Sequence, residues 1–269
     1  MILINGKKQQ TIEVTDRGLA YGDGLFETIA IASGRPVYWN RHVRRLLQGC
    51  KVLGLACPAE ELLKQELLQL VSDQKKGVVK IILTRGSGGR GYRPDPSCGI
   101  NRILSFHSWP EINPEYYSKG IALYPCTTPV SSNSRLAGLK TLCRLEQVMA
   151  QSEFDEPDYA EGVMLDDNGM VIECSKTNIF IVSQDRLYSP SLKRSGIKGI
   201  MRDVIIDLAG RLGISFTETE LDRSDLLKAD EIFVCNSIIK IWPVREYLAN
   251  QYPVGEITKT LMLEIEKES

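Results

Sequence analysis

The sequence predicts an α+β fold in two domains, and three observations support this. Short apolar runs bounded by turn residues alternate with apolar stripes at helical spacing, which is the pattern of strands mixed with helices. The segment 109–118, WPEINPEYYS, holds two prolines and no periodicity, which indicates a boundary. The length of 269 residues accommodates two small domains. We therefore expect a smaller α+β domain over 1–108, an interdomain linker over 109–120 and a larger domain over 121–269.

In the first half, two amphipathic helices are expected to pack on a sheet. Apolar residues recur at helical spacing over 43–53, and a second stripe over 62–71 follows Pro58, a residue favoured at the start of a helix. The turn signal Asn5-Gly6 closes the first strand. The predicted strands, in chain order, are 1–5, 25–32, 36–39, 78–84 and 103–106.

The second half shows the same mixture and contains a hairpin. The turn over 166–169, Asp-Asp-Asn-Gly, separates two short apolar runs, which predicts antiparallel strands at 162–165 and 170–173. Helical stripes are present at 201–212 and from Gly255 onward. The remaining predictions are strands at 121–124, 178–182, 186–188 and 231–235, and a helix at about 142–153.

Composition and charge argue against several classes of function. Lys plus Arg total 33 and Asp plus Glu total 34, so a net charge of -1 gives no electrostatic basis for binding nucleic acid or an anionic membrane. No apolar stretch approaches the length of a membrane span, and the N-terminus lacks the pattern of a signal peptide. Seven cysteines without a C-x-x-C motif favour reduced thiols over disulfides or a zinc site. We expect a cytoplasmic protein that acts on a small molecule.

Lys140 is the first candidate for the chemistry. The two histidines, His42 and His107, lie far apart without neighbours at metal-ligand spacing, so another residue type is expected to act, and no metal is expected. Lys140 follows Gly138 closely and has apolar neighbours. A lysine partly withdrawn from water is a good amine nucleophile or general base near neutral pH. The alternative is a lysine whose ammonium extends to the surface, and the local sequence leaves both open.

A glycine-rich loop follows the strand predicted at 78–84. Residues 86–91 satisfy G-x-G-x-x-G, but Pro94 and Pro96 come where a dinucleotide-binding motif needs a helix, so we reject that interpretation. The loop carries Arg90, Tyr92 and Arg93, and guanidinium groups pair well with carboxylates. It is therefore either a loop that closes over an anionic substrate or an ordinary surface loop.

Two segments of the second half are candidates for holding a ligand. Residues 195–202, SGIKGIMR, place glycines before a helix, where free N–H groups and the helix dipole favour phosphate. Glu173 precedes small hydroxyl residues over 174–178, and such a segment can serve a nitrogen base and a phosphate together. The alternatives are an ordinary loop before a helix and a strand-end glutamate that faces water.

Five segments in order, which span nearly the whole chain, are similar to those of a known family. They are Gly22–Glu27, His42–Leu46, Gly138–Lys140, Val171–Glu173 with Asn178–Phe180, and Gly199–Arg202. The chain thus resembles the fold-type IV pyridoxal-phosphate enzymes, which include D-amino-acid and branched-chain aminotransferases and aminodeoxychorismate lyase. The resemblance implies a two-domain architecture like that of D-amino-acid aminotransferase and a homodimer.

The same resemblance implies roles for individual residues. Lys140 would hold pyridoxal 5'-phosphate in a Schiff base, and Glu173 would pair with the pyridine nitrogen. Arg45 would bind the cofactor phosphate. The backbone N–H groups of Ile200 and Met201 would bind it too, and Asn236 or Ser237 would add to that phosphate site.

Within the family, two segments are similar to those of the lyases. They are Arg85–Tyr92 and Leu136–Lys140, the latter followed by 144–147 (RLEQ). The resemblance implies that Arg90, Tyr92 or Arg93 holds a substrate carboxylate. One departure is Cys143, where the lyases usually have asparagine, and we expect it to alter packing near the lysine. An aminotransferase of the same fold is the alternative, and a non-catalytic binding protein is a third hypothesis.

Overall fold

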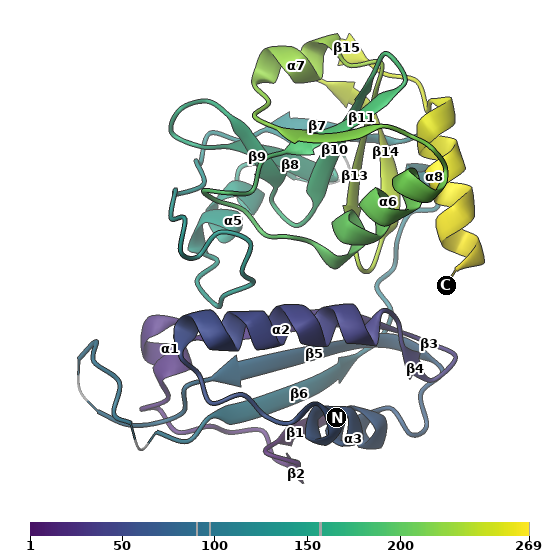
Figure 1. Ribbon diagram of the computed structural model, residues 1–269. Coiled ribbons are helices and arrows are strands. Elements are labelled where there is room, and N and C mark those ends of the chain that lie inside the picture. Colours follow the sequence, from purple (N-terminus) through teal and green to yellow (C-terminus); the bar gives the residue numbers. More distant parts are fainter. Residues whose placement is uncertain (90, 97, 156–157, 269) are drawn as a thin grey trace. The chain divides into compact units, whose positions relative to one another are not determined.

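The chain divides into two compact units, each of which is described by itself. The computed structural model describes residues 1–89, 91–96, 98–155 and 158–268. The first unit comprises Met1–Glu111 with Leu139–Cys143, and the second comprises Ile112–Gly138 with Arg144–Ser269. Each unit combines one sheet with helices, as Figure 1 shows, so the predicted α+β fold is confirmed. That residues 109–120 act as a linker stays a prediction.

The first unit is built on a six-stranded antiparallel sheet. Its strands are β1 (Ile2–Ile4), β2 (Lys7–Lys8), β3 (Gly24–Ala32), β4 (Arg35–Pro36), β5 (Lys76–Thr84) and β6 (Asn101–His107), and its helices are α1 (Arg17–Tyr21), α2 (Trp39–Leu53) and α3 (Glu60–Leu70). The strand order is β2-β1-β6-β5-β3-β4. The register of β3 on β5 runs from Gly24 opposite Thr84 to Ala32 opposite Lys76.

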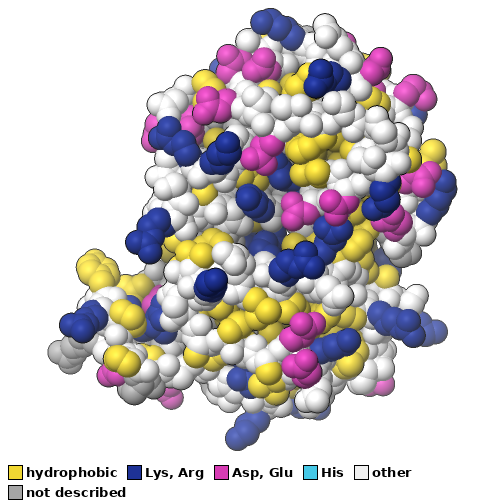
Figure 2. Space-filling view, viewed as in Figure 1, with side chains coloured by type: hydrophobic (Ala, Val, Ile, Leu, Met, Phe, Trp, Pro, Cys, Tyr) yellow, Lys and Arg dark blue, Asp and Glu magenta, His cyan; other side chains and the backbone are white. Residues whose placement is uncertain are grey.

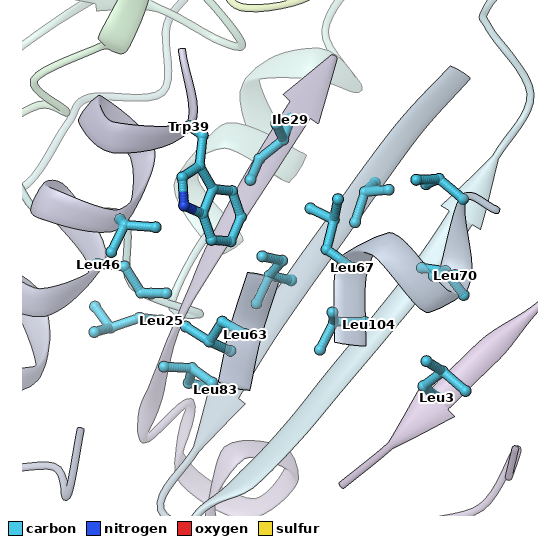
Figure 3. Packing of buried hydrophobic residues seen from close by; sticks show 14 of the residues in the cluster. Leu3, Leu25, Ile29, Trp39, Leu46, Leu63, Leu67, Leu70, Leu83 and Leu104 are labelled. Atoms are coloured by element: carbon cyan, nitrogen blue, oxygen red, sulfur yellow. The ribbon is translucent and has the colours of Figure 1, made fainter. Parts of the chain in front are cut away.

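Helices α2 and α3 pack on one face of this sheet. Side chains alternate between the two faces of a strand, so Leu25 and Ile29 of β3 point to the same side. Figure 3 shows them together with Leu46 of α2 and with Leu63 and Leu67 of α3 in one buried cluster. Burying each of these side chains contributes roughly 1.5–3 kcal/mol, which anchors both helices to the sheet.

The predicted strand at 36–39 is wrong after its first residue, because β4 ends at Pro36 and α2 begins at Trp39. Tyr38 stands before the helix in the left-handed region at φ 53°, which turns the chain sharply. Trp39, Val43 and Leu46 then follow at helical spacing and are all buried. The Trp39 indole also donates to Glu60 Oε1 at 3.0 Å, so the tryptophan joins the apolar stripe of α2.

The second unit contains a nine-stranded sheet. Its strands are β7 (Ile121–Pro125), β8 (Glu161–Leu165), β9 (Val171–Cys174), β10 (Asn178–Ser183), β11 (Arg186–Pro190), β12 (Phe216–Thr219), β13 (Glu231–Asn236), β14 (Lys240–Tyr247) and β15 (Asn250–Gln251). The order is β12-β11-β10-β13-β14-β7-β8-β9, with β15 on β14. Most pairs are antiparallel, and β14–β7, β7–β8 and β11–β12 are parallel. The predicted hairpin appears as β8 and β9.

The helices of the second unit flank this sheet. They are α4 (Glu115–Ser118), α5 (Leu145–Gln151), α6 (Ile200–Arg211), α7 (Arg223–Lys228) and α8 (Glu256–Lys267). Figure 1 shows α6 and α8 beside each other along β13 and β14, and the two helices contact each other. Their buried faces include Ile205 and Leu208 of α6 and Leu261 and Ile265 of α8. Helix α6 thereby holds a fixed position on the sheet.

The surface carries charges of both signs. On the face drawn in Figure 2, basic and acidic side chains are interspersed, in agreement with the net charge of -1. Across the part of the chain that the structure describes, every helix is too short or too polar to traverse a membrane.

Candidate active site

Lys140 lies on a short extended segment that extends the sheet of the first unit. Phe26 N donates to Lys140 O at 3.0 Å, and Leu142 N donates to Gly24 O at 3.1 Å. Leu25 and Thr141 form an antiparallel bridge between these two bonds. The helix predicted at 142–153 begins only at Leu145, and the pairing of residues 140–142 with β3 explains this later start.

The Lys140 side chain is half-buried and lies over an aromatic ring. Its Nζ is 4.4 Å from the ring centroid of Phe26, a distance at which a cation and an aromatic face attract each other. The thiol of Cys143 donates to the carbonyls of Tyr21 and Gly22 at 3.7 and 3.8 Å. Cys143 therefore ties the end of this segment to the end of α1.

Arg45 is held by a buried carboxylate. Its Nε and Nη2 donate to Glu27 Oε1 and Oε2 at 2.8 and 2.6 Å. His42, one turn earlier on α2, shares Glu27 Oε2 through Nδ1 at 2.7 Å. Glu27 lies on the same face of β3 as Leu25 and Ile29, toward α2. This bidentate pairing fixes the plane of the Arg45 guanidinium.

The electrostatics of this group follow from burial and charge. Burial alone raises the pKa of Glu27, but the Arg45 charge and the hydrogen bonds from His42 and Arg45 outweigh it and lower that pKa to about 2. Burial lowers the pKa of His42, so the imidazole is neutral near pH 7 and Nδ1 carries the hydrogen that it donates. Glu27 was not predicted to have a role. The sequence feature that could have indicated a role is the position of Glu27 on the apolar face of a predicted strand, because a buried charge requires a partner.

Arg17 holds the backbone of the glycine-rich loop. Arg17 Nη1 and Nη2 donate to the carbonyls of Gly91 and Tyr92, each at 2.9 Å. Arg17 Nε and Arg85 Nε both donate to Asp23 Oδ2. Of the predicted substrate residues, Tyr92 is 89% exposed and Arg93 is exposed. Arg90 lies outside the described residues.

In the second unit, Glu173 and Asn178 bind the backbone N–H and C=O of one residue, Ile197. Ile197 N donates to Glu173 Oε2 at 2.8 Å, and Asn178 Nδ2 donates to Ile197 O at 2.9 Å. Gln147 Nε2 also donates to Glu173 Oε1 at 3.3 Å. Glu173 is 3% exposed, which decides against a strand-end glutamate that faces water.

Helix α6 begins at Ile200, three residues after Ile197. Its N-cap is Gly199, which has no side chain to cap the helix. In an α-helix the first N–H groups, here those of Ile200 and Met201, have no acceptor within the helix. A Cβ on Gly199 would lie 2.0 Å from Asn178 Oδ1, so glycine is required for this approach. Free N–H groups at a helix start are suited to an anion, and the phosphate role of this segment stays a prediction.

The hydroxyl groups that follow Glu173 have a different role from the one expected. Ser175 Oγ and Thr177 Oγ1 both donate to the buried carboxylate of Glu161. The hydroxyls are therefore used to fix the backbone after Glu173. Sequence patterns did not indicate Glu161, since no residue near it in the chain marks it as a partner of this turn.

The other two predicted phosphate residues lie after β13. Asn236 Oδ1 accepts from the N–H groups of Ile238 and Ile239 at 2.8 and 3.0 Å, and its Nδ2 donates to Lys176 O at 3.2 Å. Its side chain therefore shapes the turn between β13 and β14. Ser237 lies in that same turn. A role for either residue at the phosphate stays a prediction.

The residues present fit a pyridoxal phosphate group in their chemistry. Glu173 offers a buried carboxylate for a ring nitrogen, and the start of α6 offers N–H donors for phosphate. Ser195 Oγ is buried and, among the described residues, has no hydrogen-bond partner. A Cβ on the neighbouring Gly196 would lie 2.8 Å from Ile172 Cγ2 and 3.4 Å from Glu173 Oε2, so the backbone already passes close to the carboxylate. The first unit, considered by itself, carries the Lys140 amine, and its role with the cofactor stays a prediction.

One cavity of the second unit lies apart from these residues. It has a volume of about 700 Å³ and is lined by charges of both signs, including Asp166, Lys193, Arg194, Glu218 and Glu220. Among the residues that the structure describes, its lining includes none of the predicted site residues. No cluster of three or more His, Cys, Asp or Glu side chains suited to a metal was found in the same described ranges.

A family model and full-length relatives match this chain. The model described as "Amino-transferase class IV" matches residues 24–247. An aminodeoxychorismate lyase from Vibrio harveyi is 32% identical over 266 residues, which cover 97% of this chain and 98% of that protein. A putative branched-chain-amino-acid aminotransferase from Methanocaldococcus jannaschii is 34% identical over 274 residues, at 97% and 93% coverage.

A solved structure matches in fold and in sequence. The crystal structure of 4-amino-4-deoxychorismate lyase from Pseudomonas aeruginosa superposes with a TM-score of 0.96 and is 38% identical, covering 99% of this chain and 98% of that one. Fold and sequence similarity therefore point to the same group of proteins.

Proposed function

This chain belongs to the class IV aminotransferase family, and we propose that it is a pyridoxal-phosphate-dependent aminodeoxychorismate lyase. The reaction converts 4-amino-4-deoxychorismate to 4-aminobenzoate and pyruvate, a step of folate biosynthesis. The nearly complete mutual coverage with lyases, in sequence and in structure, supports this choice of reaction. The observation that carries the cofactor chemistry is the buried Glu173 carboxylate. It accepts a hydrogen bond from Ile197 N, two residues before Gly199, the N-cap of α6.

Each candidate residue has a role that its surroundings favour. Lys140 would hold the cofactor covalently through Nζ, and Glu173 would keep the ring nitrogen protonated. Arg45 and the N–H groups of Ile200 and Met201 would bind the phosphate. When bound, pyridoxal phosphate supplies an electron sink for the charge that proton removal creates.

The Lys140 amine would also move the proton. When the substrate amine takes the place of Lys140 on the cofactor, the freed Nζ would take the proton from the substrate carbon that bears the amino group, as a general base. The enolpyruvyl group leaves from the adjacent carbon with its oxygen and, after it takes up a proton, becomes pyruvate. The remaining ring becomes aromatic, which supplies driving force, so the protein mainly needs to position the substrate and transfer protons.

The exposed loop is the proposed substrate-binding element. Arg17 holds its backbone at Gly91 and Tyr92, which leaves the side chains of Tyr92 and Arg93 exposed. We propose that Arg90, Tyr92 or Arg93 binds a substrate carboxylate, in line with the preference of guanidinium groups for carboxylates.

Two measurements test this function. Borohydride reduction of the holoenzyme followed by peptide mapping should place the label on Lys140, and label on another lysine, or no label, would refute its role. Chromatography should detect 4-aminobenzoate and pyruvate in equal amounts from 4-amino-4-deoxychorismate. Lys140→Ala should lower this rate by about 10²–10⁴-fold or more, the usual contribution of a positioned base.

An aminotransferase of the same fold is the second candidate, favoured by the similarity to the M. jannaschii protein. Incubation with an amino acid and a 2-oxo acid separates the two. Turnover there, without pyruvate release from 4-amino-4-deoxychorismate, would favour the aminotransferase. A purified protein that binds no yellow cofactor would favour a non-catalytic binding protein instead.

We propose further that the chain forms a homodimer in the cytoplasm. Helix α5 exposes Leu145, Val148 and Met149 at 71%, 59% and 52%, and their spacing places them on one helix face. An exposed apolar stripe of this kind is typical of an interface. All seven cysteines are free thiols, which suits a reducing compartment. Sedimentation equilibrium should give twice the chain mass, and a monomer at micromolar concentration would contradict the dimer.

A further inference from the structure

The carboxylate of Glu161 is buried at the base of the turn that follows Glu173. Glu161 is the first residue of β8 and is 0% exposed. It accepts four hydrogen bonds, two on each oxygen. The donors are Gly162 N and Ser175 Oγ on Oε1, and Lys176 N and Thr177 Oγ1 on Oε2.

Three of these donors lie in one turn, residues 174–177, which joins β9 to β10. Two backbone bonds also close the turn: Cys174 N donates to Thr177 O at 2.8 Å, and Ser175 N donates to Gly162 O at 2.9 Å. Residues 174–177 are therefore attached to the start of β8 through the Glu161 carboxylate. A carboxylate that accepts several hydrogen bonds holds its donors more firmly than a neutral group would.

The residues on either side of this turn are the two that bind the backbone of Ile197. Glu173 precedes the turn and accepts from Ile197 N, and Asn178 follows it and donates to Ile197 O. The conformation of residues 174–177 sets the distance between the Glu173 carboxylate and the Asn178 amide group. The same conformation sets the approach of Asn178 to Gly199, the N-cap of α6.

We propose that Glu161 is a positioning residue of the cofactor site, which fixes the 174–177 turn and through it the Glu173 carboxylate and the backbone at Ile197. This inference rests on the proposed cofactor roles of Glu173 and α6. Glu161 itself is fully buried, and both of its carboxylate oxygens accept hydrogen bonds from protein donors. Its effect on the cofactor is therefore expected to pass through Glu173 and Asn178.

The conservative substitution Glu161→Gln removes one acceptor without changing the size of the side chain. Its amide nitrogen cannot accept from a backbone N–H, so one end of the turn loses its attachment. Thr177→Val tests the same attachment from the other side, because it removes only the hydroxyl donor. We expect each variant to weaken the binding of pyridoxal phosphate to the apoprotein by about tenfold, since displacing a ligating group by a fraction of an ångström has effects of that order.

Glu231 provides a matched control in the same unit. Its carboxylate also accepts from backbone N–H groups and a hydroxyl, namely Ile257 N, Thr258 N and Thr258 Oγ1. In the pairing of β10 with β13, Glu231 lies opposite Val182, at the other end from Asn178. Glu231→Gln should lower thermal stability about as much as Glu161→Gln does, because it loses a comparable set of hydrogen bonds. It should leave cofactor affinity within about twofold of that of the unchanged protein.

Fluorescence titration of the apoproteins with pyridoxal phosphate is the deciding measurement. In a Glu173→Gln background, Glu161→Gln should weaken binding much less than it does alone, because the two act through one carboxylate. Three results would each overturn the proposal. They are a cofactor affinity of Glu161→Gln within twofold of that of the unchanged protein, a loss of affinity equal to that of Glu231→Gln, and effects of Glu161→Gln and Glu173→Gln on affinity that are fully additive.

A second readout needs neither cofactor nor substrate. Hydrogen exchange at the Ile197 amide of the apoprotein should be faster in Glu161→Gln than in Glu231→Gln, and equal rates would refute the positioning role. A protein that binds pyridoxal phosphate but releases no 4-aminobenzoate would refute the proposed reaction and leave this inference standing. The two failures are therefore distinguishable.

Discussion

Glu27→Gln is the substitution whose consequences the structure allows us to work out most fully. The change removes the charge that receives Arg45 and His42. The pKa of Glu27 is about 2, against an ordinary value of 4.5. That difference corresponds to about 3 kcal/mol of stabilisation near pH 7, at about 1.4 kcal/mol per tenfold change in proton affinity. The Arg45 side chain is 12% exposed, so we expect the destabilisation to lie near the low end of the roughly 3–5 kcal/mol seen for broken buried pairs.

The pH dependence has a definite sign. The folded pKa of Glu27 lies below the unfolded one, so the unfolded chain takes up the proton first as the pH falls. The stabilisation is therefore complete above about pH 5.5 and is lost as the pH falls from 4.5 toward 2. For the unsubstituted protein, the loss is about 1 kcal/mol at pH 4 and about 2 kcal/mol at pH 3. The difference from Glu27→Gln should shrink by the same amounts.

Hydrogen exchange of β3 and β5 amides, measured as a function of urea, reports the opening of the first unit alone. Glu61→Gln, on the exposed side of α3, is the control and should change stability by no more than about 0.5 kcal/mol. A destabilisation by Glu27→Gln below about 1 kcal/mol at pH 7 would refute the reasoning. So would a difference between the two proteins that stays constant from pH 5 to pH 3.

Gly199→Ala should weaken pyridoxal phosphate binding at least about tenfold in titrations of the apoprotein, because the new Cβ would lie 2.0 Å from Asn178 Oδ1. Gly210→Ala, in the same helix but with nothing within 4 Å, should leave that affinity unchanged and stabilise the protein by up to about 1 kcal/mol; an equal loss of affinity in both would contradict the steric argument. Leu63→Ala, at a fully buried position, should cost about 2–5 kcal/mol in urea denaturation. Leu62→Ala, 38% exposed, should cost less than about 1 kcal/mol, and similar values for the two would show that α3 does not pack as described.

Elements with a strong local pattern were predicted well. The stripe over 43–53 and the compact run over 78–84 correspond to α2 and β5, with ends that differ by a few residues. The hairpin of β8 and β9 followed from its turn sequence alone. In each case the residues that decide the structure are neighbours in the chain, so periodicity and turn chemistry carry the information.

Features that depend on distant partners were not predictable in this way. The segment around Lys140 is extended because it pairs with β3, more than a hundred residues earlier. Strand β14 (Lys240–Tyr247) was missed, since Pro243 interrupts a run that the sheet nevertheless accommodates. Glu161 meets its partners only once β8 and the 174–177 turn come together. Such contacts are set by tertiary pairing, which overrides local preference.

Glu27 and Glu161 are both buried, but they differ in what compensates their burial, and this orders the expected effects of replacing them. Glu27 faces Arg45, whose charge lowers the pKa. Burial instead raises the pKa of Glu161, which the charge of Lys176 and the hydrogen bonds to the carboxylate offset only in part. Removing a carboxylate charge lowers the free energy of unfolding most where a buried opposite charge is left without its partner. The loss is much smaller where burial of the carboxylate was itself unfavourable. Glu27→Gln should therefore lower the free energy of unfolding more than Glu161→Gln. Glu161→Gln should in turn change cofactor affinity out of proportion to its effect on stability, and a Glu161→Gln protein that is destabilised as much as Glu27→Gln would contradict this ordering.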